Sequence, residues 1–400
     1  MATCIFCPAV LGKTTRPEHI LHNGLGGRKT TNRTICSACN NRFGGDIDKN
    51  FVEQFAVIRN LLQLRLGTGE LPPMIKKAKA GKDTVTIERD GKLTLVTKPF
   101  TITDSPEGPK QLHVSGDTLE QIEANIPHMA AALKISEDDL RERLSGTEVS
   151  IEERWPDPIQ FSFALGGPKA MRSAAKSCLV LWAVQVGNNE VKNGSYDGTI
   201  KYINGENGIF HETRINLDSR LYDDPNMLVE KYGPVFSMIY VKSNHSGRVV
   251  GHFTALNLIG FSIVLAEAGG VPNRQIALIT DPITGVWSAD IAERLNVPFE
   301  WLDSPDYDYD SMDRSRQRFD AMMTHQFTTS RSRELHRIID DVLKGHGLKE
   351  GDLIPPEMAA SISQGIAGRA ARQLLGIPSK TPITPEKMRQ MFADKPKSPD

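Results

Sequence analysis

Two Cys-x-x-Cys pairs, Cys4/Cys7 and Cys36/Cys39, constrain this chain more than any other feature. Each pair puts two thiols on one tight turn, so two such turns supply four sulfur ligands in the tetrahedral arrangement that suits Zn²⁺. Disulfide or redox use is the alternative, but a redox pair normally occurs once, near a βαβ pattern that is missing here. The fifth cysteine, Cys178, falls on the apolar side of a predicted helix and is expected in the core. The sequence therefore predicts a small N-terminal module held together by structural zinc.

The rest of the chain has the composition of a globular protein. Its 400 residues, 39% of them hydrophobic, leave room for two or three domains. The longest apolar stretch, residues 256–266, is interrupted by polar residues and is shorter than the roughly 20 residues of a bilayer span. The first residues lack the basic and apolar regions of a secretory signal. These features predict a cytoplasmic protein without a membrane span.

Charge is unevenly distributed along the chain. The formal net charge is -1, yet residues 1–50 hold seven cations and three anions. The opposite bias occurs at residues 303–313, where five aspartates are crowded together. We interpret the acidic run as a solvated face, and the basic module as a candidate for phosphate contacts.

Hydrophobic periodicity predicts a mixed α+β fold in four segments: a zinc-stapled ββα-metal module (1–50), a connecting helix and hairpin (51–146), an α+β body (147–305) and a helical region with a disordered tail (306–400). Apolar residues at three- and four-residue steps from Ile47 to Leu62 predict one amphipathic helix that ends near Gly67. Further helices are expected at 169–186, 331–344 and 356–375. A hairpin is expected at 84–98, with strands at 148–153, 234–242, 247–256, 261–266 and 275–280. The tail from residue 379 is rich in Pro and Lys and is expected to be disordered.

The segments around the cysteine pairs carry a recognisable motif. Glu18-His19-Ile20 and Leu25-Gly26-Gly27 lie between the pairs, and the second pair runs directly into Asn40 and then Asp46-Ile47-Asp48. Together these elements resemble the HNH endonuclease family, in the subgroup with paired cysteine knuckles, over residues 4–51. The resemblance implies a ββα-metal fold, with a strand bearing Glu18-His19, a second strand near 33–35, and a short helix bearing Asn40.

The same resemblance implies roles for individual residues. Phosphodiester hydrolysis needs a base to activate water and a cation to hold the phosphate. His19 matches the general base, because its unperturbed pKa is near 6.5. Glu18 matches the acidic metal ligand, and Asn40 matches the last metal-binding position. An asparagine there binds through a neutral oxygen, which favours Mg²⁺ or Mn²⁺ as the catalytic ion.

Other positions near the motif have more than one interpretation. Asn32 is our choice for the middle asparagine that orients the base, although its spacing leaves His22 or Asn23 as alternatives. Asp46 and Asp48 are candidate auxiliary metal ligands, but capping of the following helix is the favoured role.

In the body, residues 166–169 are a candidate phosphate-binding turn, with Lys169, Arg172 and Lys176 along the helix that follows. The favoured interpretation is a proline-initiated helix with a solvated basic stripe. Arg331, Arg333 and Arg337 on a later helix are a comparable stripe.

The leading hypothesis for function is an endonuclease that cuts DNA, and the resemblance suggests restriction or antiphage defence as its setting. The candidate DNA-binding residues are Arg28, Lys29, Arg33 and Arg42. The body would then select substrate, form a homo-oligomer, or sense a small-molecule trigger. Two alternatives stay open: a zinc ribbon that binds nucleic acid or protein without catalysis, and a nuclease gated by a nucleotide.

Overall fold

The computed structural model describes residues 2–96, 98–105, 108–114, 119–145, 149–153, 157–161, 164–206, 214–218, 220, 225–289, 292–304, 309–375 and 379–383. The fold is mixed α+β, as predicted. The chain divides into two compact units. Unit 1 comprises residues 1–75, 88–92 and 161–328, and unit 2 comprises residues 76–87, 93–160 and 329–400.

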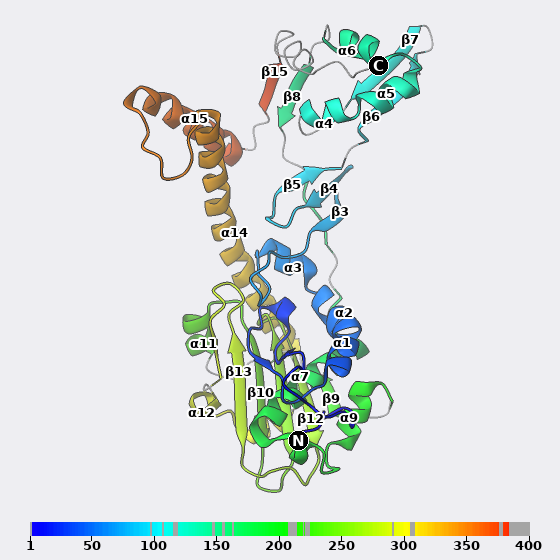
Figure 1. Cartoon of the computed structure of the whole chain (residues 1–400). Helices are drawn as coiled ribbons and strands as arrows, with labels where there is room; N and C mark the ends of the chain where they lie inside the picture. Colours follow the sequence, from blue (N-terminus) through cyan, green and yellow to red (C-terminus); the bar gives the residue numbers. More distant parts are fainter. Residues whose placement is uncertain are drawn as a thin grey trace. The chain divides into compact units, whose positions relative to one another are not determined.

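Residues 2–62 of unit 1, here called the finger, form a small ββα arrangement followed by two helices (Figure 1). Its elements are β1 (Glu18–His19), the 3-10 helix η1 (Asn23–Leu25), β2 (Thr30–Thr31), α1 (Ser37–Gly45), α2 (Ile47–Glu53) and α3 (Ala56–Leu61). Strand β1 carries Glu18-His19 and α1 carries Asn40, as expected, and β1 pairs antiparallel with β2. The second strand lies earlier than the expected 33–35, because Thr34 instead accepts a hydrogen bond from Ile5 in the first cysteine turn (3.0 Å).

The expected single helix from Ile47 to Leu62 is instead two helices, α2 and α3. The apolar residues of the pattern are buried as predicted. The backbone turns at Phe55, whose N–H bonds the carbonyl three residues back, on Val52, at 3.1 Å. The neighbouring Gln54 side chain exchanges two hydrogen bonds with the backbone of Gly166, at 2.8 and 2.9 Å. A tertiary contact thus fixes the point where the chain turns between α2 and α3.

The core of unit 1 is a six-stranded antiparallel sheet in the order β14-β13-β10-β11-β12-β9. Its strands are β9 (Ile215–Leu217), β10 (Ser237–Ser243), β11 (Val249–Ala255), β12 (Ile259–Ala266), β13 (Gln275–Thr280) and β14 (Trp287–Ser288). The predicted central strands are confirmed. They are buried almost throughout, because helices cover both faces.

Helix α7 (Pro168–Val186), predicted from its apolar periodicity, is the middle layer of unit 1 (Figure 1). One side of α7 packs on β10 to β13 and the other packs against α2 of the finger, so every residue from Ser173 to Ala183 is buried. Cys178 lies in this core, as expected. The remaining unit 1 helices are α8 (Asn188–Val191), α9 (Asp197–Asn204), α11 (Pro225–Tyr232), α12 (Ala292–Leu295), α13 (Phe299–Asp303) and the first part of α14 (Tyr309–Gly345).

Unit 2 contains small sheets and helices. Its elements are β3 (Ile75–Ala80, from its second residue), β4 (Asp83–Ile87), β5 (Leu93–Leu95), β6 (Phe100–Ser105), β7 (Gly108–Val114), α4 (Leu119–Ala124), α5 (Ile126–Leu133), α6 (Glu137–Ser145), β8 (Val149–Glu153), the end of α14, α15 (Pro356–Leu375) and β15 (Ser379–Ile383). The predicted hairpin is the β4–β5 pair, and the predicted C-terminal helices are confirmed.

Two expectations for the C-terminal part are corrected. The predicted disordered tail begins too early, since β15 pairs with β8 over five residues; residues 384–400 lie outside the described part. In the acidic run, Asp303 accepts a hydrogen bond from Arg248 at 2.8 Å, so it is not simply a solvated carboxylate. Nowhere in the described ranges is a helix both long and apolar enough to cross a bilayer.

Candidate functional site

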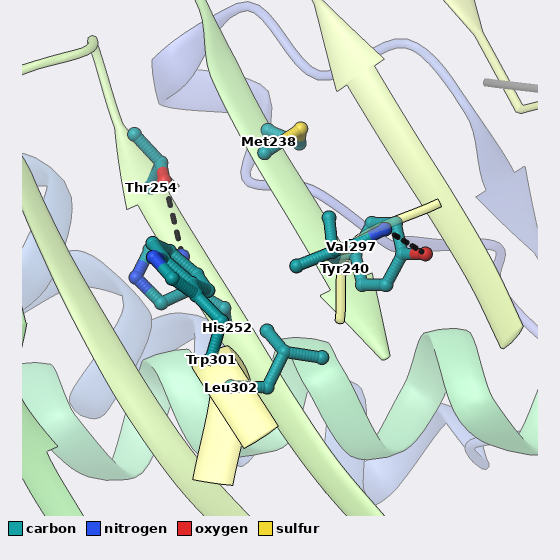
Figure 2. Close-up of a pocket in the computed structure, with 7 residues that line it drawn as sticks. All are labelled: Met238, Tyr240, His252, Thr254, Val297, Trp301 and Leu302. Atoms are coloured by element: carbon teal, nitrogen blue, oxygen red, sulfur yellow. Dashed lines mark hydrogen bonds between the residues drawn. The ribbon is translucent and has the colours of Figure 1, made fainter. Parts of the chain in front are cut away.

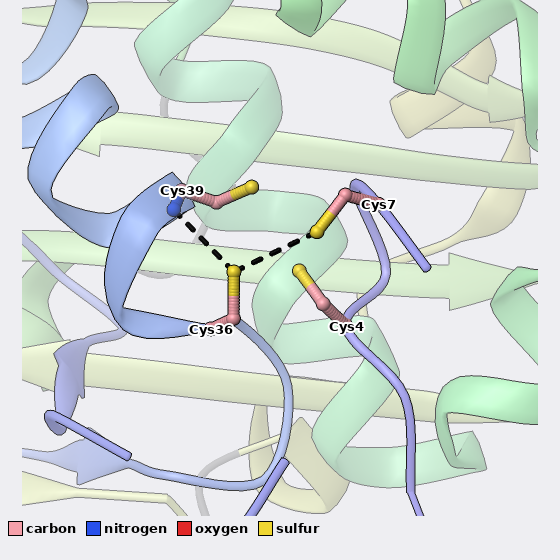
Figure 3. Close-up of side chains that lie close together, drawn as sticks. All are labelled: Cys4, Cys7, Cys36 and Cys39. Carbon is pink, nitrogen blue, oxygen red and sulfur yellow. Dashed lines mark hydrogen bonds between the residues drawn. The ribbon is translucent and has the colours of Figure 1, made fainter. Parts of the chain in front are cut away.

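The four finger cysteines converge at one point (Figure 3). All four sulfur atoms lie within 4.8 Å of one another, and none is in a disulfide. Cys7 Sγ and Cys36 Sγ are 3.6 Å apart. Tetrahedral zinc with Zn–S bonds of about 2.3 Å separates its sulfurs by about 3.8 Å. The cluster therefore fits a structural zinc ion.

Backbone N–H groups already point at two of these sulfurs. Phe6 N donates to Cys4 Sγ (3.4 Å) and Cys39 N donates to Cys36 Sγ (3.5 Å). Burial raises the pKa of the Cys4 and Cys39 thiols, which disfavours free thiolates. A bound cation reverses that preference because it stabilises the thiolate form directly.

Strand β1 directs Glu18 toward the body of unit 1. The Glu18 side chain is only 5% exposed, and its Oε1 lies 2.5 Å from the ammonium of Lys176 on α7. Lys176, which is 1% exposed, also lies 2.5 Å from Asp48 Oδ2 on α2. Helix α7 thus supplies one buried cation to two carboxylates of the finger.

The same cluster extends through hydroxyl and imidazole groups. Ser173 donates to Asp48 Oδ1 at 2.5 Å, and His22 Nε2 lies 2.6 Å from the Ser173 hydroxyl and 3.2 Å from that carboxylate. Burial alone would raise the pKa of Asp48, but Lys176 and His22 hold it well below its usual value. Burial likewise opposes the charge on Lys176, yet the carboxylates raise its pKa. Hydrogen bonds and ion pairs thus connect the five side chains of this cluster, Glu18, His22, Asp48, Ser173 and Lys176.

These contacts correct two expectations. Asp48 does not cap α2; its carboxylate is committed to α7, and the residue before α2, Asp46, also makes no side-chain cap and instead pairs with Lys169 at 2.6 Å. The basic residues of α7 are not a continuous solvated stripe either, although Lys169 is 53% exposed. Lys176 is buried, and Arg172 donates to the carbonyl of Ile203 at 2.7 and 3.1 Å.

Glu18 and Asn40 each keep one oxygen for a further ligand. Glu18 Oε2 has no hydrogen-bond partner in the described part of the chain and is not fully buried. The Asn40 amide nitrogen donates to the carbonyl of Pro17 (3.0 Å), which holds α1 against β1 and leaves Oδ1 as the open atom. Carboxylate and amide oxygens are hard donors of the kind that Mg²⁺ and Mn²⁺ prefer.

His19 follows Glu18 on β1 and points to the other side of the strand. The ring is partly buried and has no hydrogen-bond partner among the residues that the structure describes. Burial lowers its pKa, with the nearby Lys176 charge adding to the effect and Glu18 opposing it. The imidazole is thus biased toward the neutral form that accepts a proton.

The candidates for the orienting residue differ in their surroundings. Asn32 lies exposed, one position beyond Thr31, the residue that pairs with Glu18. The Asn23 side chain accepts the N–H of Thr68 at 3.0 Å and so holds a loop. His22 belongs to the buried cluster and is the candidate most closely connected to Glu18.

The four candidate DNA-binding residues differ in their contacts. Arg28 and Arg33 are exposed, and Lys29 lies over the indole ring of Trp287, 4.8 Å from its centroid. Arg42 is exposed on α1 and donates to Asn204 Oδ1 at 2.7 Å. Lys29 and Arg42 thus each contact a side chain of the body.

Ser173 was not identified from the sequence, and Lys176 was named only in the basic stripe that follows the candidate phosphate-binding turn. One signal was present: Lys176 is the only charged residue between Ser173 and Val186, in a segment that is otherwise almost entirely apolar. A lone lysine in a helix that is buried on all sides requires a partner of opposite charge.

A second cluster of polar groups lies on the far face of the sheet. Its cavity of about 10 Å³ has room for one water molecule and is lined by Met238, Tyr240, His252, Thr254, Val297, Trp301 and Leu302 (Figure 2). His252 Nδ1 bonds Thr254 Oγ1 (3.3 Å), and its Nε2 is buried without a hydrogen bond. The cavity is far too small for a nucleotide.

The cysteine cluster predicts about one zinc per chain in protein purified without added metal, measured by elemental analysis. Cys36→Ser should lose this zinc and increase amide hydrogen exchange in residues 2–62, because a finger of this size depends on its metal for stability. Cys178→Ser serves as the control, since that thiol lies outside the cluster. Wild-type protein that contains no zinc but whose finger is protected from amide hydrogen exchange would exclude the structural zinc site.

The buried ion pairs predict that Lys176→Met costs unit 1 about 3–5 kcal/mol in free energy of unfolding, because two carboxylates lose their cation. Lys169→Met, on the same helix but at an exposed ion pair, should cost at most about 1 kcal/mol. Urea unfolding followed by tryptophan fluorescence reports this, since three of the four tryptophans belong to unit 1. Equal losses in the two variants would contradict the prediction.

Comparison with known proteins agrees with this geometry. Residues 4–56 match the family model described as HNH endonuclease, which includes the cysteine cluster, β1 and α1. No curated protein and no solved structure matches the chain. The match indicates a nuclease and implies a nucleic-acid substrate. Residues 4–56 thus carry the signature of the HNH endonuclease family, within a chain that extends well beyond that family model.

Proposed function

We propose that the finger and α7 together form a metal-dependent endonuclease that hydrolyses DNA phosphodiester bonds. The observation that carries this proposal is the state of Glu18: one oxygen is held by Lys176, and the other is open. His19 is its neighbour on β1, and Asn40 is bonded to the residue that precedes it. A zinc ribbon without catalytic activity would not require a glutamate with one open oxygen beside a histidine and an asparagine.

In this proposal Glu18 Oε2 and Asn40 Oδ1 would hold the catalytic ion, Mg²⁺ or Mn²⁺. When bound, the ion neutralises charge on the scissile phosphate and its leaving oxygen. Lys176 is a positioning residue, because its ion pair restricts the rotation of the Glu18 carboxylate. Asp48 offsets the charge of Lys176, so the ammonium does not leave excess positive charge beside the ion.

His19 acts as the general base. Its neutral ring accepts a proton from water while the water oxygen bonds to phosphorus. The bond from phosphorus to the leaving oxygen breaks, and that oxygen takes a proton from solvent. The lowered pKa keeps the ring unprotonated at neutral pH. Use in restriction or antiphage defence stays a prediction.

His19→Ala should cut plasmid DNA about 10² to 10⁴-fold more slowly than wild type, while zinc content and DNA binding remain. Cleavage with Mg²⁺ or Mn²⁺, and binding measured separately, test this. Wild-type cleavage at saturating metal should rise with pH and level off, with an inflection below the usual 6.5 because His19 must lose its proton. His19→Ala should lack this inflection; near wild-type cutting by it would refute the assignment and favour the zinc ribbon.

Mn²⁺ affinity, measured by electron paramagnetic resonance on zinc-loaded protein, tests the metal ligands apart from activity. Glu18→Ala and Asn40→Ala should weaken binding, and excess Mn²⁺ should restore part of their cleavage. Lys176→Met should weaken binding about 10- to 100-fold, as expected for loss of a group that orients a ligand. Lys176→Arg should recover part of this loss, and Lys169→Met should change nothing. If folded Lys176→Met protein binds Mn²⁺ with wild-type affinity, Lys176 does not position the metal ligand Glu18.

A further inference from the structure

The turn between β13 and β14 exposes an apolar patch on unit 1. Three apolar side chains within five residues are exposed there: Ile283 (41%), Val286 (51%) and Trp287 (41%). Trp287 is on β14, the edge strand of the six-stranded sheet. An exposed indole beside two exposed aliphatic side chains is a feature of contact surfaces.

Two cations of the finger border this patch. The Lys29 ammonium lies 4.8 Å from the centroid of the Trp287 ring. The Arg28 guanidinium lies against Gly285, so closely that a side chain at that position would collide with it. The patch therefore combines an aromatic ring with positive charge from a different part of the chain.

The turn is held rigidly in this position. Asp281, which is buried, accepts the N–H of Ile283 at 2.8 Å and the Thr284 hydroxyl. Thr280 donates to the carbonyl of Gly26 in the finger at 3.2 Å. The acidic side chain in this turn is thus turned inward, whereas the cations stay at the surface.

The patch is adjacent to the strand pair that carries His19. Lys29 O accepts the N–H of Ile20 at 3.1 Å, and the next residue, Thr30, pairs with His19. A nucleic-acid strand with its phosphate at His19 would therefore have neighbouring nucleotides within reach of Lys29 and Trp287.

The charge of the patch favours nucleic acid over a second copy of this chain. A symmetric dimer through β14 would bring Arg28 and Lys29 of one copy close to the same residues of the other. Nucleic acid supplies phosphates for the cations and flat bases for the ring. Aromatic side chains stack best on bases that are unpaired.

We propose that Trp287, Lys29 and Arg28 form a nucleic-acid-binding surface, on which an unpaired base stacks on the indole while adjacent phosphates bind the two cations. This proposal rests on the proposed nuclease function and extends it, because it assigns part of substrate binding to the sheet of the body. It also makes a single-stranded or distorted segment of DNA the preferred ligand.

The test measures binding of full-length, zinc-loaded protein to a single-stranded oligonucleotide and to a blunt duplex, in a His19→Ala background that slows cutting. Trp287→Ala should weaken single-strand binding about 5- to 150-fold, the equivalent of one lost stacking contact, and Trp287→Phe should recover most of it. The salt dependence should be unchanged in Trp287→Ala. In Lys29→Gln the slope of log affinity against log salt should fall by about one.

Phe327→Ala is the matched control, because Phe327 is another exposed aromatic residue of unit 1 at 61% exposure. An equal loss in this control, an unchanged affinity in Trp287→Ala, or an equal loss on the blunt duplex would overturn the stacking surface. A wild-type dimer that dissociates in Trp287→Ala would also overturn it, because the patch would then be a dimer interface.

The same variants distinguish this proposal from the proposed nuclease function. If His19→Ala abolishes cleavage while Trp287→Ala binds normally, the binding surface is refuted and the nuclease function is supported. If the wild-type protein does not cut DNA but Trp287→Ala weakens binding, the nuclease function is refuted and the binding surface is supported.

Discussion

The arrangement of unit 1 depends on one buried ammonium group. Lys176 lies between Glu18 and Asp48, two carboxylates that come from the finger, while the lysine itself comes from α7. Removing the lysine charge while these layers stay packed would leave two buried carboxylates without a cation, which costs several kcal/mol. Because α7 also packs on the sheet, the same helix holds the finger to the body and completes its site. The finger is therefore an integral layer of the unit, not an appended module.

The parts of the structure that were predictable from sequence are those with local signals. The cysteine spacing predicted the cluster, and alternation or helical periodicity predicted the central strands and α7. The connection between Lys176 and Glu18 was not predictable, since the two residues are 158 positions apart. A lysine in a helix is ordinarily solvated, and only the position of α7 between two apolar layers makes it buried.

The incorrect expectations share a physical cause. Asp48 was assigned to a helix cap, and residues 47–62 to one helix, because both choices satisfy local rules. In the structure, distant partners compete for the same groups: Lys176 binds the carboxylate, and Gly166 binds the side chain of Gln54 where the helix breaks. The tail strand β15 likewise forms because β8 offers it a pairing edge. Local rules fail where long-range contacts replace the local ones.

The origin of Lys176 in α7 has a consequence for the order of events during synthesis. The cysteines are complete once residue 39 has been made, so the zinc cluster can close early, whereas Lys176 is translated 120 residues after the end of the matched segment. At about 5–20 residues per second, this is a delay of roughly 6–24 s. During that interval Glu18 and Asp48 lack their cation and remain hydrated. A nascent chain can thus close its cysteine cluster before the proposed metal ligand Glu18 is oriented by Lys176.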